Sequence, residues 1–94
     1  MDITNKVAIV TGASGGIGRE VSLKLAAAGA RLALVARTPE KLMALKKEIE
    51  EKGAQVIVIP TDITDGKSVE EMIAQVVKHY GQLKRFVKLT GLYF

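Results

Sequence analysis

Apolar residues follow two different patterns along the chain. Short continuous apolar runs lie at Lys6–Thr11, Arg31–Ala36 and Gln55–Pro60, each bounded by residues that favour turns. Runs of this length predict strands that are buried on both faces of a sheet. A shorter run of the same kind at Arg85–Leu89 predicts a fourth strand.

The segments between these runs have apolar residues at helical spacing. The first predicted helix begins near Ile17 and ends at Gly29, a residue type suited to the position after a helix. Its expected apolar face consists of Ile17, Val21, Leu25 and Ala28.

Two further helices have recognisable start and stop signals. Thr38 and Pro39 predict the N-cap and first position of a helix that ends at Gly53. Residues 68–71 form a capping-box sequence, which predicts the start of a helix that ends at Gly81. The expected buried face of this last helix consists of Val69, Met72, Ile73, Val76, Val77 and Tyr80.

The alternation of strands and helices predicts an α/β fold. Strands joined by helices make a parallel sheet with right-handed crossovers. We therefore expect a Rossmann-type three-layer domain over residues 1–94, truncated to about four strands in the order 3-2-1-4, with residues 84–94 forming an atypical basic and apolar end. Ligands of such sheets bind at the carboxyl ends of the strands, near the switch point between strands 1 and 4.

A glycine-rich turn follows the first predicted strand at residues 11–18. Gly12 would let the chain turn sharply, Gly16 would let backbone approach a pyrophosphate, and Gly18 would let the helix pack closely on the sheet. The helix that begins near Ile17 would offer free N–H groups and a positive dipole end to the phosphates. The alternative interpretation is a plain tight turn.

The spacing of this turn, T-G-x-x-x-G-x-G, resembles the short-chain dehydrogenase/reductase family, and the resemblance extends from about residue 6 to residue 83. It implies an oxidoreductase that transfers hydride between a nicotinamide and a carbonyl or alcohol when complete. A cytoplasmic location is expected separately, from the lack of cysteine and of a recognisable secretion signal. The resemblance also implies that Ser14 lies near the adenosine ribose and that Asp62 and Ile63 hold the adenine edge. Capping of a loop is the alternative role for Asp62.

The end of the second strand predicts which dinucleotide is bound. An NAD(H) site needs an acid there to accept a hydrogen bond from the ribose 2′-hydroxyl. This strand ends in Ala36 and Arg37, and a guanidinium is a natural partner of a 2′-phosphate. NADP(H) is therefore favoured over NAD(H), and the candidate cofactor-binding residues are Gly12, Ser14, Gly16, Ile17, Gly18, Arg37, Asp62 and Ile63.

The resemblance weakens after Gly81. Lys84 stands where the family has an acid, and residues 88–91 match the family's Asn-Asn-Ala-Gly motif only at Gly91. The family's catalytic serine and Tyr-x-x-x-Lys pair are not found, and the string Tyr80 to Lys84 is interpreted as coincidence because Gly81 interrupts the helix. We expect no catalytic residues here, so a non-catalytic dinucleotide-binding or interaction module is the alternative function. A methyltransferase is a weaker alternative, since it would need an acid at the end of the second strand.

Composition and charge narrow the choices further. The chain has no cysteine and one histidine, which argues against disulfides and against a metal site. The net charge of +4 comes from Lys78, Lys84, Arg85 and Lys88, a set too sparse to predict nucleic-acid binding. No apolar run reaches the length of a membrane span, and no secretion signal is recognisable. An apolar fourth strand at the sheet edge predicts self-association.

Overall fold

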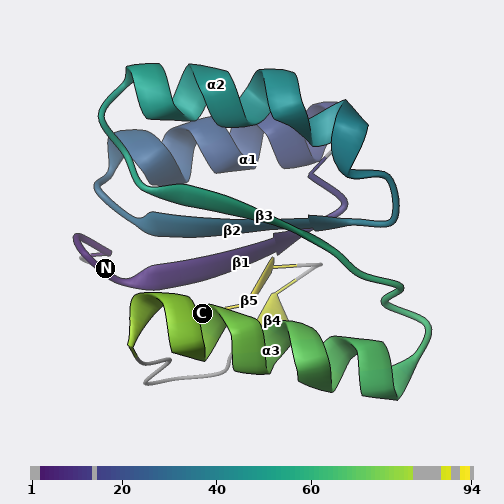
Figure 1. Cartoon of the computed structure of the whole chain (residues 1–94). Helices are drawn as coiled ribbons and strands as arrows, with labels where there is room; N and C mark the ends of the chain where they lie inside the picture. The colour runs from purple at the N-terminus through teal and green to yellow at the C-terminus, as the bar shows by residue number, and fades with distance from the viewer. Residues whose placement is uncertain (1–2, 14, 82–87, 90–91, 94) are drawn as a thin grey trace.

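The computed structural model describes residues 3–13, 15–81, 88–89 and 92–93. Three parallel strands form the centre of the sheet: β1 (Val7–Thr11), β2 (Arg31–Ala36) and β3 (Val56–Pro60). The helices are α1 (Gly16–Ala27), α2 (Met43–Glu51) and α3 (Gly66–Tyr80), and a short 3-10 helix, η1 (Pro39–Leu42), precedes α2. Helices α1 and α2 cover one face of the sheet and α3 covers the other, so the predicted three-layer α/β architecture is confirmed (Figure 1).

The register of the three parallel strands aligns their carboxyl ends. Thr11 lies opposite Val35, and Ala36 lies opposite Pro60. The alignment continues for one residue, because the Thr61 N–H donates to the carbonyl of Ala36 at 3.0 Å. The loops that follow β1, β2 and β3 therefore all leave from the carboxyl ends of the strands, here called the carboxyl edge of the sheet, where the sequence predicts the ligand site.

The predicted strand order is confirmed for strands 3-2-1 and is wrong for the fourth position. Beside β1 lies β5 (Leu92–Tyr93), which is antiparallel to it, and β4 (Lys88–Leu89) pairs with the far side of β5. Only two residues separate β4 from β5, and so short a connection permits antiparallel pairing only. Strand β4 thus runs in the direction predicted for strand 4 but lies one place further from β1. The rest of the predicted strand, residues 85–87, lies outside the described residues.

Two buried clusters lie on the two faces of the sheet. On β1, Ala8 and Val10 face α1 and α2, whereas Val7 and Ile9 face α3. On β2, Leu32 and Leu34 belong to the first cluster and Ala33 and Val35 to the second. This double burial explains why the strands are continuous apolar runs rather than alternating ones.

The buried stripe of α1 differs from the prediction. Its buried residues are Ser22 and Ala26, while Ile17 is 83% exposed and Val21 is only half-buried. Small side chains on this stripe let the helix lie close to the sheet, and the Ser22 hydroxyl donates to the carbonyl of Gly18 at 2.7 Å, which satisfies it inside the core. Apolar spacing alone therefore selected the wrong face of α1.

The predicted starts of α2 and α3 needed correction, whereas the start of α1 near Ile17 and the predicted helix ends are confirmed. Helix α3 has Asp65 as its N-cap, with the carboxylate accepting from the Lys67 N–H at 3.1 Å, so it begins before the capping box expected at Ser68. The chain after Thr38 first forms η1, and α2 begins only at Met43. The glycines that end the helices, Gly29, Gly53 and Gly81, all have positive φ as expected.

The predicted buried face of α3 is confirmed for five of its six residues and is wrong for Val77. Met72, Val76 and Tyr80 are buried, and Val69 and Ile73 pack partly against them. Val77 is 38% exposed, because it lies to the side of the stripe formed by residues spaced four apart.

Candidate functional site

The glycine turn leaves β1 at the carboxyl edge of the sheet. Gly12 has φ of +65°, a conformation that favours glycine, and its carbonyl accepts a hydrogen bond from the Gly15 N–H at 3.2 Å. Ala13 is only 1% exposed and belongs to the core cluster under α1, so it anchors the turn. The expected sharp turn at Gly12 is confirmed, and Ser14 lies outside the described residues.

Gly18 and Gly16 have opposite surroundings. A Cβ on Gly18 would lie 2.3 Å from the Gly12 oxygen and 2.7 Å from the Ala13 Cα, which confirms that this position needs glycine for close packing of helix and turn. A Cβ on Gly16 would meet nothing within 4 Å. Gly16 therefore faces open space beside the turn, where a ligand could approach the backbone.

The N-terminus of α1 adds a positive end to this edge. The helix begins at Gly16, its N-cap Gly15 forms no side-chain cap hydrogen bond, and no acidic residue lies in the first turn. The first N–H groups of a helix lack intrahelical partners and carry the positive end of its dipole. Ile17, in the same turn, exposes its apolar side chain to solvent.

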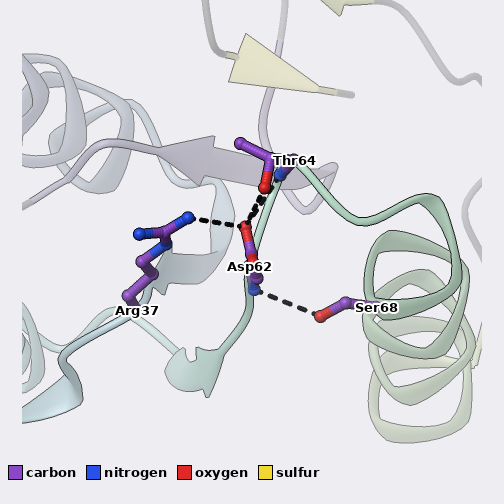
Figure 2. Close-up of polar contacts among 4 residues, drawn as sticks. All are labelled: Arg37, Asp62, Thr64 and Ser68. Atoms are coloured by element: carbon purple, nitrogen blue, oxygen red, sulfur yellow. Dashed lines mark hydrogen bonds and ion pairs between the residues drawn. The ribbon is translucent and has the colours of Figure 1, made fainter.

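Arg37 and Asp62 come together directly after β2 and β3. The Arg37 Nη2 lies 3.1 Å from the Asp62 Oδ1. Figure 2 marks this contact with a dashed line. The two side chains remain 68% and 44% exposed. Within the part of the chain that the structure describes, Arg37 forms no other side-chain hydrogen bond or ion pair, so the rest of its guanidinium is available to a ligand.

Asp62 is held by its own loop as well as by Arg37. Its Oδ1 accepts from the Thr64 hydroxyl at 2.6 Å and from the Thr64 N–H at 3.0 Å, and the Asp62 N–H donates to the Ser68 hydroxyl at 3.1 Å (Figure 2). The Thr64 hydrogen bonds, followed by Arg37, lower the pKa of Asp62 to about 2. Asp62 is therefore ionised at neutral pH, and the loop-capping role considered for it is present.

The roles of Thr64 and Ser68 in the site were missed by sequence reasoning. The signal for Thr64 was the spacing Asp-x-Thr, which is typical of an Asx turn in which the carboxylate bonds the residue two positions on. Ser68 carried no comparable signal, because the contact depends on how α3 meets the end of β3. The neighbouring Ile63 is 54% exposed at this loop.

Arg19, a basic residue in the first turns of α1, is used between helices. Its Nη2 lies 2.7 Å from both carboxylate oxygens of Glu48 on α2. Arg19 therefore links α1 to α2 on the surface of the domain.

Tyr80 lies at the amino end of β2, whereas Arg37 follows the carboxyl end of the same strand. Its hydroxyl is buried and donates to the carbonyl of Leu32 at 2.6 Å, and burial raises the pKa of Tyr80 to about 12. Arg31 lies over the ring, 5.4 Å from its centroid. Tyr80 thus joins α3 to β2, and its proposed partner in the Tyr-x-x-x-Lys string, Lys84, lies outside the described residues.

Among the described residues, no three histidine, cysteine or acidic side chains come close enough together to hold a metal ion. Over the same residues, no helix combines the length and apolar character needed to cross a membrane.

Comparison with known proteins gives a consistent result. The family model for short chain dehydrogenases matches residues 6–93. A fatty acyl-CoA reductase of Acinetobacter baylyi is 42% identical over 90 residues, which cover 96% of this chain and 30% of that protein. The chain therefore spans about a third of the length of this relative.

Solved structures of the same family bind both dinucleotides. A metagenomic short-chain oxidoreductase in complex with NADP has a TM-score of 0.81 at 34% identity, over 87% of this chain and 37% of that one. A short chain dehydrogenase/reductase from Burkholderia phymatum in complex with NAD has a TM-score of 0.83 at 29% identity, over 88% and 30%.

Proposed function

Because the chain belongs to the short-chain dehydrogenase family, we propose that it carries the adenosine-phosphate half of an NADP(H) site. The site lies at the carboxyl ends of β1, β2 and β3, where Arg37 contacts Asp62 and where the turn after β1 leads into α1. Its proposed contacts are Gly12, Ser14, Gly16, Ile17, Gly18, Arg37, Asp62 and Ile63.

The observation that carries the preference for NADP(H) is the exposed Arg37 guanidinium directly after β2. A phosphate dianion can form charge-assisted and bidentate hydrogen bonds with a guanidinium. The residue that would accept from a 2′-hydroxyl in an NAD(H) site is absent from the end of this strand, which reads Val35, Ala36, Arg37.

The glycine turn supports the same proposal at the pyrophosphate. Open space beside Gly16 and the free first turn of α1 allow phosphate oxygens to approach backbone N–H groups. The exposed side chains of Ile17 and Ile63 offer apolar contacts to the rings of the cofactor.

Calorimetric titration with two nucleotides tests the preference. Adenosine 2′,5′-bisphosphate and adenosine 5′-monophosphate differ only in the 2′-phosphate, and loss of a charge-assisted contact worth about 1.5–3 kcal/mol corresponds to roughly a 10- to 150-fold difference in affinity. Arg37→Gln should abolish this difference, whereas Lys41→Gln, at an exposed lysine on η1, should preserve it. Equal affinities of the unmutated protein for the two nucleotides would contradict the assignment.

For the reaction, we propose that these residues bind the cofactor and that hydride transfer to a carbonyl depends on residues outside the set described. Tyr80 is the one candidate acid with the family's spacing to a lysine. Its hydroxyl donates a hydrogen bond to the carbonyl of Leu32 instead of facing a substrate site. The chain by itself should then show no steady NADPH oxidation with ketones. Turnover that disappears in Tyr80→Phe would refute this and would favour an active enzyme over a binding module.

Self-association is proposed through the edge of the sheet that ends in β4. An unpaired strand edge can pair with another chain. In the described part of the sheet, β4 pairs only with β5, so its other side is unpaired. Light scattering at micromolar concentration should detect a dimer or larger species, and a monomer would exclude this pairing.

A further inference from the structure

We propose that Asp62 competes with the 2′-phosphate for Arg37, so that NADP(H) binding exchanges one partner of this arginine for another. The inference rests on the proposed function, and it assigns to Asp62 a part in choosing between NADP(H) and NAD(H). In the structure the Asp62 carboxylate is bonded to the same guanidinium that a 2′-phosphate would need (Figure 2).

The geometry indicates that the contact of Asp62 with Arg37 can break while its hydrogen bonds to Thr64 remain. Their contact is a single one of 3.1 Å, longer than is usual for a charge-assisted hydrogen bond, and both side chains are well exposed. The same oxygen keeps two other donors from Thr64, at 2.6 and 3.0 Å. When Arg37 leaves, Asp62 therefore remains bonded and the loop after β3 keeps its shape.

The ion pair between Arg19 and Glu48 has a tighter geometry than the pair between Arg37 and Asp62. Arg19 approaches both oxygens of Glu48 at 2.7 Å, and the two residues lie on neighbouring helices. Arg37 and Asp62 instead follow the ends of two strands, and only one carboxylate oxygen takes part. The pair at the site is the looser of the two.

The charges decide the direction of the effect. A phosphate dianion that reaches Arg37 comes close to the Asp62 carboxylate, and like charges at short range repel each other. When NAD(H) binds, no 2′-phosphate is present to pair with Arg37, and Asp62 can remain its partner. The Asp62 carboxylate thus favours NAD(H) by keeping the arginine charge neutralised. Removal of the Asp62 charge should therefore widen the preference for NADP(H).

Asp62→Asn is the informative variant, because the asparagine oxygen can still accept from Thr64. Titrations with adenosine 2′,5′-bisphosphate and adenosine 5′-monophosphate should show the ratio of affinities rising about two- to fivefold, the range expected for an exposed ion pair. The matched control is Glu40→Gln, which removes an exposed acid on η1 and should leave the ratio unchanged. In an Arg37→Gln background, Asp62→Asn should raise the ratio less, because only the repulsion between the carboxylate and the phosphate is then removed.

Every other result of the Asp62→Asn titrations also tests the proposed exchange. Equal falls in both affinities would confine Asp62 to the adenine edge, a fall for the bisphosphate alone would make it a positioning residue for Arg37, and unchanged affinities would leave it without a part in the choice. All three overturn the exchange while leaving the NADP(H) preference intact. If the unmutated protein shows no preference but Asp62→Asn does, the exchange holds and the proposed preference is wrong. No preference in either protein refutes both.

Discussion

Gly18 is the position where one added methyl group should cost most, because the turn and the helix touch there. In Gly18→Ala the new Cβ would lie 2.3 Å from the Gly12 oxygen, 2.7 Å from the Ala13 Cα and 2.9 Å from the Gly12 carbonyl carbon. All three atoms are backbone, so relief requires movement of the turn or of α1. Ala13 is buried in the core, which restricts that movement.

The size of the effect follows from two opposing terms. Overpacking against backbone costs about 3 kcal/mol, the upper end of the usual range, because every contact is far below van der Waals distance. Alanine in place of glycine in a helix returns about 1 kcal/mol. We therefore expect Gly18→Ala to lower the free energy of unfolding by about 2 kcal/mol, or roughly 8–16 °C in Tm for a domain of this size.

Gly16→Ala is the matched control, two residues away in the same helix. A Cβ there meets nothing within 4 Å, so the variant should be neutral or more stable by up to about 1 kcal/mol. Urea and thermal unfolding, followed by circular dichroism at 222 nm, measure both variants. Stabilities of the two variants within about 0.5 kcal/mol of each other would refute the close packing at Gly18, since the expected difference is near 2–3 kcal/mol.

Two predictions concern titratable groups. Thr64→Val should raise the pKa of Asp62 above its value of about 2 by more than Arg37→Gln does, because the Thr64 hydroxyl is the largest cause of the lowered pKa; carboxyl NMR titration measures both. A larger effect of Arg37→Gln would contradict this ranking. Since the folded-state pKa of Asp62 is below its ordinary value of 3.8, the stabilisation is present above about pH 4 and is lost as the pH falls toward 2. Tyr80→Phe should lower the free energy of unfolding by about 1 kcal/mol in urea titrations through loss of the hydrogen bond to Leu32, and no change would mean that this bond contributes nothing net. Because burial raises the pKa of Tyr80 from 10.0 to about 12, the unmutated protein should also lose stability between these pH values, and Tyr80→Phe should not.

Local sequence signals determined most of the architecture. Continuous apolar runs place β1, β2 and β3 within one residue of their predicted bounds, because strands buried on both faces tolerate few polar residues. Glycines with positive φ mark the helix ends at Gly29, Gly53 and Gly81, since few other residues adopt that conformation. The parallel register then brings the ends of β2 and β3 to one edge, as expected.

Tertiary structure decided what depends on contacts between distant segments. Spacing could not tell that α1 buries Ser22 rather than Ile17, because that choice depends on how closely the helix lies against the sheet at Gly18. The place of β5 beside β1 likewise depends on which of two short strands pairs with the open edge.

The same distinction applies to the site. Sequence identified Arg37 and Asp62 separately, Arg37 by its position after a strand and Asp62 through the family resemblance. Their contact at 3.1 Å arises only when β2 and β3 pair in register, because the two residues lie 25 positions apart in the sequence. The sequence by itself thus determined which groups lie at the carboxyl edge, and the packing of the strands decided that a cation and a carboxylate there hold each other.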